Sequence, residues 1–272
     1  MIKHLIYDIE EIVPYINWLY FFHAWGLNGK SSKERENMRE EALQLLSSWQ
    51  GKYHTHALFG IFDANSDGDD LLLGNVRIPM LRQQHPTEVG GPNLCLADFV
   101  RPLASGIADR VGAFCTTVDG EVTSAYKHDE YEALLSQVVS DRLAEATAEK
   151  MHQEVRKNYW GYAPDEHLSI DQLHREEYQG IRPAIGYPSL PDVSVNFLLD
   201  RLLDMSQVNI RLTESGMMVP HSSVSGFMFA HPQSRYFDLG KIGEDQLVDY
   251  ARRRGLPKEL VRRFLQSKLI KQ

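Results

Sequence analysis

The stretch from Trp160 to Asp192 restricts the fold more than any other part of the sequence. It contains four prolines and three glycines within WGYAPDEHLSIDQLHREEYQGIRPAIGYPSLPD. Proline lacks a backbone donor and fixes φ, so it interrupts helix interiors and is confined to the edges of sheets. Residues 179–192 therefore cannot form a long helix or a central strand, and a single short helix, at 169–177, is predicted in the whole stretch.

Helical and strand patterns follow one another irregularly in the rest of the chain. Apolar residues recur at helical spacing in the longest predicted helix, residues 129–159. Other elements are assigned by the same patterns: helices at 31–50, 195–205, 240–255 and 257–270, strands at 56–63, 71–79, 210–213 and 223–230, and buried strands or strand–helix elements at 93–100 and 107–118. This order predicts an α+β fold with an antiparallel sheet. No G-x-G-x-x-G sequence follows a strand, so nothing supports a Rossmann site.

The N-terminal segment, up to Trp25, is apolar and aromatic, with Pro14 inside it. We expect a short helix, a turn and then a buried aromatic strip, because large aromatic side chains usually serve core packing. The strip consists of Tyr15, Trp18, Tyr20, Phe21, Phe22 and Trp25.

Charge and composition exclude several classes of protein. The formal net charge of -8 argues against broad nucleic-acid binding, which needs a basic surface. No apolar run approaches the ~18 residues of a membrane span, and acids interrupt the apolar N-terminus, unlike a signal peptide. Cys95 and Cys115 lie in apolar runs without a CxxC partner, which indicates buried free thiols in a reducing compartment. We expect a cytoplasmic protein.

The C-terminal segment is locally basic. Residues 251–272 contain eight Lys or Arg and one Glu. Such a segment is either the solvated face of a helix or a docking patch for an acidic partner, and both interpretations remain open.

An acidic turn lies between the first two predicted strands. Asp63, Asp67, Asp69 and Asp70 suggest calcium ligands, but Gly74 stands where the calcium loop of an EF-hand needs its last Glu. We therefore predict a plain turn and no metal site.

The loop at residues 180–188, GIRPAIGYP, has the composition of a ligand cradle. Gly180 and Gly186 allow another group to approach the backbone closely. Arg182 offers a planar charged fork suited to a carboxylate, and Tyr187 offers an aromatic face with a hydroxyl. A zwitterionic amino-acid ligand fits these groups. The alternative is a structural turn whose Arg pairs with a local acid.

The residues resemble a known family. The resemblance is carried by NLCLADFV (93–100), SDRLAEATAE (140–149), VRKNYWGYAPDE (155–166), YQGIRPAIGYP (178–188), LTES (212–215), SVSGFMFAHPQSRYF (223–237) and DQLVDYARRRG (245–255). In this order they are similar to the C-terminal activation domain of cobalamin-dependent methionine synthase, from about Tyr15 to the end of the sequence.

This resemblance implies a fold and an activity. It implies a C-shaped α+β single domain, residues 1–272, with a twisted antiparallel sheet and flanking helices. It implies binding of S-adenosylmethionine, which methylates the cobalamin of the synthase after a flavodoxin-like donor has reduced inactive cob(II)alamin. The products are methylcobalamin and S-adenosylhomocysteine.

The resemblance also assigns site residues. Arg182 is expected to bind the ligand carboxylate, and the Ala184 backbone the adenine or ribose. Tyr187 is expected to face the reacting centre and the corrin, with Glu145 as a helix carboxylate beside the ligand; these two are the candidate catalytic residues. The remaining ligand-binding positions that it implies are Asn17, Gly186, Tyr236 and Phe237.

The sequence departs from the family in two ways. Asn17 stands where the family has an Asp that meets the ligand's amino group, and loss of such a charged contact weakens binding roughly tenfold. No D-x-H-x-x-G cobalamin signature occurs either, so we expect an accessory subunit that acts on a separate synthase chain and is not a complete enzyme.

Three alternatives remain open. The first is a sensor that binds S-adenosylmethionine, the second is an activator of a different corrinoid methyltransferase, and the third is a scaffold that no longer binds the ligand.

Overall fold

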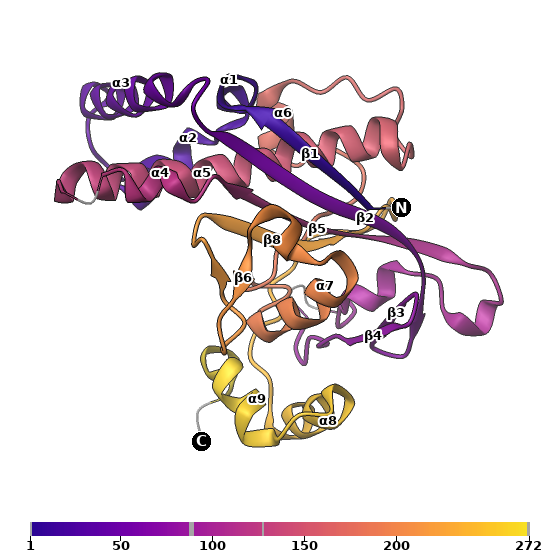
Figure 1. The fold of residues 1–272 in the computed structure, drawn as a ribbon. Coiled ribbons are helices and arrows are strands. Elements are labelled where there is room, and N and C mark those ends of the chain that lie inside the picture. The colour runs from indigo at the N-terminus through magenta and orange to yellow at the C-terminus, as the bar shows by residue number, and fades with distance from the viewer. Residues whose placement is uncertain (1, 87–89, 127, 271–272) are drawn as a thin grey trace.

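The computed structural model describes residues 2–86, 90–126 and 128–270 (Figure 1). Its centre is a six-stranded antiparallel sheet with the strand order β4-β3-β2-β5-β8, in which β1 also pairs with β2. The strands of this sheet are β1 (Ile2–Asp8), β2 (His54–Asp67), β3 (Asp70–Leu73), β4 (Val76–Pro79), β5 (Asp109–Val118) and β8 (Ser223–Met228). A separate two-stranded sheet is formed by β6 (Arg211–Leu212) and β7 (Met218–Val219).

Helices cover both faces of the sheet (Figure 1). The α-helices are α1 (Ile9–Ile12), α2 (Trp18–Ala24), α3 (Ser32–Trp49), α4 (Glu121–Ser124), α5 (Glu130–Glu154), α6 (Ile170–His174), α7 (Asn196–Leu203), α8 (Glu244–Arg254) and α9 (Lys258–Phe264). A π-helical turn, Val155–Tyr159, extends α5. The described residues also form six short 3-10 helices: Val13–Tyr15, Leu96–Phe99, Leu103–Ser105, Val193–Val195, Met205–Val208 and Gln266–Lys268.

The two faces of β2 are buried in different cores because successive side chains of a strand point in opposite directions. Ala57 and Phe59 pack with α1, α3 and α5, whereas Leu58 packs with α7 on the opposite face. A third apolar cluster joins α8 and α9. The expected α+β arrangement with an antiparallel sheet is therefore present, and α5 spans the sheet as its principal cover.

The prediction for the N-terminus is wrong in two respects. Residues 2–8 form strand β1, which pairs along β2 from Ile2 opposite Gly60 to Asp8 opposite His54. The partner strand lies far along the chain, and its contacts override the local pattern. The aromatic strip is only partly buried, because Phe21 is fully enclosed whereas Tyr20 is 63% exposed.

The acidic turn is confirmed, and its acids are engaged by arginines. Strand β2 continues through the turn sequence to Asp67, and Gly68 adopts a positive φ before β3 begins. Arg77 pairs with Asp67 and Asp70, at 2.7 and 2.6 Å. Arg82 pairs with Asp69 at 2.6 Å. Among the described residues, no group of three or more His, Cys, Asp or Glu is arranged to hold a metal ion.

Other sequence predictions are confirmed more simply. The predicted starts of the helices at 31–50, 129–159 and 169–177 agree with the structure, in which Ser31, Asp129 and Ser169 are the N-caps of α3, α5 and α6. Cys95 and Cys115 are buried free thiols, and burial raises the pKa of Cys95 to about 12. In the described parts of the chain, no helix combines the length and the apolar character that crossing a bilayer requires.

The basic C-terminal segment is largely neutralised within the fold. Six of its cations form ion pairs with acids: Arg252, Arg253, Arg254, Lys258, Arg262 and Lys268. Arg253 reaches Asp70 on β3 at 2.5 Å, and Arg254 reaches the buried Asp192 at 3.1 Å. Lys271 lies outside the described residues. Arg253 and Arg254 therefore fasten α8 to the rest of the domain, and Lys258 and Arg262 tie α9 to Glu244 of α8. A docking role for this segment stays a prediction.

Candidate functional site

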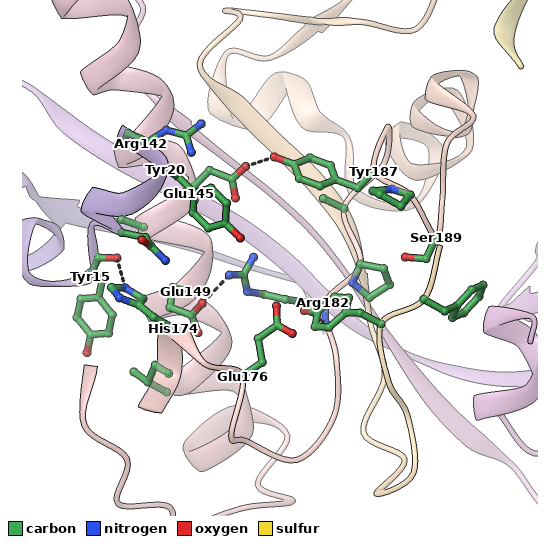
Figure 2. A pocket seen from close by; sticks show the side chains of 18 of the residues that line it. Tyr15, Tyr20, Arg142, Glu145, Glu149, His174, Glu176, Arg182, Tyr187 and Ser189 are labelled. Atoms are coloured by element: carbon green, nitrogen blue, oxygen red, sulfur yellow. Dashed lines mark hydrogen bonds and ion pairs between the residues drawn. The ribbon is translucent and has the colours of Figure 1, made fainter. Parts of the chain in front are cut away.

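A cavity of about 540 Å³ opens between α5, α6 and the loop at residues 182–189 (Figure 2). Its volume falls in the range of about 300–1,000 Å³ that is typical of small-molecule sites. Its walls are formed by Tyr15, Asn17, Tyr20, Arg142, Glu145, Ala146, Glu149, Leu173, His174, Glu176, Arg182, Pro183, Ala184, Tyr187, Pro188, Ser189, Tyr236, Phe237 and Asp238.

Helix α5 supplies the charged wall of the cavity. Arg142, Glu145 and Glu149 all line it, because residues three or four apart share one helix face. Buried side chains of α5 hold the helix in place, and Leu143 and Ala146 are among them. The cavity therefore faces a rigid row of one guanidinium and two carboxylates.

The proline-containing loop forms the opposite wall by attaching to the free edge of β8. Ile181 exchanges backbone hydrogen bonds with Phe229 at 3.0 and 2.9 Å, and the Ile185 amide donates to the Ser225 carbonyl at 2.8 Å. Pro183 contributes only its carbonyl, which accepts from the Phe227 amide at 3.2 Å. Proline fits here because an edge segment can lack one donor.

Gly226 of β8 makes this attachment possible. A Cβ atom at this position would lie 2.3 Å from the Pro183 carbonyl oxygen and 3.0 Å from the Ala184 Cα. Both are backbone atoms, so the loop would have to move away from the strand.

We predict that Gly226→Ala lowers the free energy of unfolding by about 1–3 kcal/mol, the usual cost of overpacking, and distorts the cavity wall. Chemical denaturation measures this change. Gly120→Ala is the matched control, because Gly120 has a helical φ of -67° and its Cβ would meet nothing within 4 Å. Equal stability of the two variants would contradict the role assigned to Gly226.

Arg182 forms a buried ion pair with Glu149 at the centre of the cavity. The Nη2 atom of Arg182 donates to Oε2 of Glu149 at 2.6 Å, and the two side chains are only 14% and 8% exposed. Burial disfavours the charge on Arg182, but the Glu149 carboxylate outweighs it and raises the pKa of Arg182 well above its ordinary value. The pairing of Arg182 with a local acid, one of the two alternatives from the sequence, is therefore present.

The hydrogen-bonding groups of this ion pair are only partly used. Nε of Arg182 and Oε1 of Glu149 are both buried and have no hydrogen-bond partner within the described structure. An unsatisfied buried donor or acceptor costs about 1–3 kcal/mol, so such atoms usually meet a partner. One free donor and one free acceptor therefore remain at the cavity, and a zwitterion carries the complementary pair of groups.

Tyr187 stands at the rim of the cavity, opposite Glu145 (Figure 2). Its hydroxyl donates a hydrogen bond to Oε1 of Glu145, although the residue is 49% exposed. Burial and the neighbouring Glu145 carboxylate raise the pKa of Tyr187, so the phenol stays protonated at neutral pH. Tyr187 thus acts as a hydrogen-bond donor and as an accessible aromatic face.

Asn17 lies on the cavity wall and has a structural task. It is the N-cap of α2, and its Oδ1 accepts from the Leu19 amide at 3.1 Å. Asparagine is among the preferred N-cap residues because its oxygen satisfies a free helix donor. Its side chain brings no charge to the cavity.

The structure brings together seven of the eight residues that the sequence nominated. Asn17, Glu145, Arg182, Ala184, Tyr187, Tyr236 and Phe237 line the cavity. Tyr236 also accepts a hydrogen bond from the Arg182 amide at 3.0 Å. Gly186 is not among the lining residues. With a φ of 93° it makes the turn that precedes Tyr187, and its ligand contact stays a prediction.

Several cavity residues were missed by the sequence analysis. Glu149 has a signal in the sequence, because it lies four residues after Glu145 on the same helix. Glu176 and His174 come from the end of α6, and the Nε2 atom of His174 contacts the Tyr15 carbonyl at 3.0 Å. Their position depends on how α6 packs across the domain, which no local pattern in the sequence indicates.

Comparisons with known proteins agree with this architecture. Residues 8–255 match the family described as vitamin B12 dependent methionine synthase, activation domain. A solved structure, described as the crystal structure of the MetH reactivation domain bound to AdoHcy, is similar with a TM-score of 0.93 and 38% sequence identity. The similarity covers 100% of this chain and 91% of that chain, which confirms the predicted α+β fold class. The extent of the domain, residues 1–272, stays a prediction. The chain belongs to the activation-domain family of vitamin B12-dependent methionine synthase.

Proposed function

We propose that the chain binds S-adenosylmethionine in the cavity and supports the reductive remethylation of cobalamin on a methionine synthase. The observation that carries this proposal is the half-satisfied Arg182–Glu149 pair, whose free donor and free acceptor match the carboxylate and ammonium of an amino-acid ligand. The similar reactivation domain bound to AdoHcy, the demethylated form of the same ligand, supports the choice among amino-acid ligands.

The residues of this chain then have distinct tasks. Arg182 binds the ligand carboxylate through its free Nε, and Glu149 keeps the guanidinium fixed. The backbone of Ala184, tied to β8 beside Gly226, offers groups to the adenosine part. Tyr187, held by Glu145, covers the rim where the methyl group leaves the ligand. These tasks consist of binding, orientation and exclusion of water.

The reaction needs two further components. Cob(II)alamin must gain one electron before its cobalt takes the methyl group from the sulfonium, so a donor is required, and we propose a flavodoxin-like one. The cobalamin is carried by a separate cobalamin-binding module. A cytoplasmic setting is part of the proposal, and the two buried free thiols support it.

Calorimetry and thermal denaturation test the ligand. We expect S-adenosylmethionine and S-adenosylhomocysteine to bind, and adenosine or methionine alone to bind far more weakly. A ligand that binds only the folded state stabilises it by about 2.7 kcal/mol at one hundred times its Kd, which raises the midpoint of unfolding. The proposal would be contradicted if neither S-adenosylmethionine nor S-adenosylhomocysteine bound to the chain.

A second assay tests the activity. A cobalamin-binding module in the cob(II)alamin state is mixed with the chain, a reductant and S-adenosylmethionine carrying a labelled methyl group. We expect label on the cobalamin, together with the spectral change of methylation. Binding without methyl transfer would favour the sensor over the activator.

A further inference from the structure

Two histidines meet across the first two strands of the sheet. The Nε2 atom of His4 on β1 lies 3.1 Å from the Nδ1 atom of His56 on β2. Side chains of a strand alternate between its faces, so His56 shares the face of Leu58, the residue opposite His4 in the pairing of the two strands. Phe59 and α5 lie on the other face. The histidine pair is therefore on the side of the sheet that faces away from the charged wall of the cavity.

A carboxylate fixes the ring of His56. The Nε2 atom of His56 lies 2.9 Å from Oδ1 of Asp119. Asp119 is itself held by the backbone of His54, whose amide donates to Oδ2 at 2.8 Å and whose carbonyl accepts from the Asp119 amide at 3.1 Å. An ionised carboxylate only accepts hydrogen bonds, so we assign the proton of the neutral His56 ring to Nε2. The Nδ1 atom of His56 then keeps a lone pair, which faces His4.

This arrangement is typical of a histidine that binds a metal ion. A ligating imidazole usually donates its other N–H to a carboxylate, which orients the ring and makes the free nitrogen more basic. Two imidazole nitrogens on one tetrahedral Zn²⁺ ion, each about 2.0–2.1 Å from it, are about 3.3 Å apart. The separation of 3.1 Å between His4 and His56 is close to this value. A slight rotation of the exposed His4 ring supplies the difference.

The pair leaves room for other ligands of an ion. In the part of the chain that the structure describes, no three His, Cys, Asp or Glu side chains converge on one ion position. The described residues therefore supply two ligands at this place, and water completes the coordination. Because His4 is exposed, an ion reaches the pair directly from solvent.

We propose that His4 and His56 bind a divalent transition-metal ion such as Zn²⁺ or Ni²⁺, with Asp119 orienting the ring of His56. Imidazole nitrogen suits these ions, whereas Mg²⁺ prefers oxygen ligands. Such an ion joins β1 to β2 and so stabilises the attachment of the first strand. The inference is independent of the proposed function, because none of its three residues lines the cavity.

Calorimetry at about pH 7.5, where imidazoles are mostly neutral, measures the binding of Zn²⁺ and of Mg²⁺ to the full chain without a histidine tag. We expect one Zn²⁺ ion per chain and no comparable binding of Mg²⁺. An ion that binds only the folded state stabilises it, so Zn²⁺ should also raise the melting temperature. Absence of Zn²⁺ binding by the wild type would overturn the inference.

Substitutions identify the ligands. His4→Ala removes a ligand and should weaken Zn²⁺ binding by more than about tenfold, because the loss of an outer partner alone costs about 10–100-fold. Asp119→Asn removes that outer partner's charge and should weaken binding about tenfold. The melting temperature of each variant without the ion shows that the fold is retained, and the rise with Zn²⁺ should disappear in His4→Ala.

His54→Ala is the matched control. His54 lies two residues before His56 on the same strand and is 3.3 Å from Asp8, and its loss leaves both proposed ligands in place. We expect this variant to bind Zn²⁺ as the wild type does. Ring signals of His4 and His56 in NMR spectra should shift on addition of Zn²⁺, which identifies the ligands without any substitution. Binding that survives His4→Ala, or that falls equally in His54→Ala, would show an ion attached to scattered surface histidines and would overturn the inference.

Discussion

Replacing Arg182 by alanine should weaken S-adenosylmethionine binding by about ten- to a hundredfold. The substitution removes the charged donor for the ligand carboxylate, and each charged hydrogen bond contributes about 1.5–3 kcal/mol. It also leaves the buried Glu149 without its cation, and breaking a buried pair costs about 3–5 kcal/mol of the free energy of unfolding. Calorimetry measures the first effect and urea denaturation the second.

A double variant separates these two effects. In Arg182→Ala with Glu149→Gln, the orphaned charge is gone, so we expect much of the stability to return while binding stays lost. Arg175→Ala is the control for removing an arginine near the cavity, because Arg175 is exposed and its ion pair within the described part of the chain is with Glu177. Wild-type affinity in Arg182→Ala would contradict the position assigned to the ligand carboxylate.

Replacing Glu166 by alanine should lower the free energy of unfolding by about 3–5 kcal/mol, because it leaves a buried arginine unpaired. Arg156, at the end of α5, is fully buried and holds Glu166 through two hydrogen bonds of 2.7 Å each. Its guanidinium also donates to Nδ1 of His152 at 2.8 Å and lies 4.0 Å from the centre of the Tyr178 ring. Urea denaturation measures the loss.

The comparison that tests this interpretation is an exposed pair. Glu177→Ala removes the partner of Arg175 in solvent, where an ion pair contributes little, so stability should hardly change. Arg156→Met combined with Glu166→Leu replaces the buried charges by apolar groups, and such exchanges are often neutral or stabilising. If Glu166→Ala were as stable as the wild type, the pair would not hold the end of α5.

The Arg156–Glu166 pair also bears on the site. It ties the segment after α5 to the helix that carries Glu145 and Glu149, and His152 beside it is buried and electrically neutral. Burial first, and then the charges of Arg156 and Arg182, lower the pKa of His152 well below its ordinary value. A second buried polar network therefore follows the charged wall of the cavity along the same helix, from His152 into the π-helical turn.

The sequence predicted the parts of this protein that depend on near neighbours. Ser31, Asp129 and Ser169 mark the starts of three helices, because a cap depends on residues within one turn. The prolines after Gln179 excluded a central strand, and the structure places this loop at the edge of β8. The sequence motifs that carry the resemblance to the family also nominated Arg182, Glu145 and Tyr187 as site residues.

Tertiary structure decided what depends on distant partners. Residues 2–8 are a strand because β2, about fifty residues later, offers an edge, whereas their own pattern suggested a helix. Glu149 faces Arg182 because α5 and the loop are both packed against one sheet, and Asn17 shares their cavity while it caps α2. Glu176 points into the cavity only because a left-handed turn ends α6 there. Patterns along the chain report local conformation, and the pairing of charges across the cavity arises only when separate elements meet.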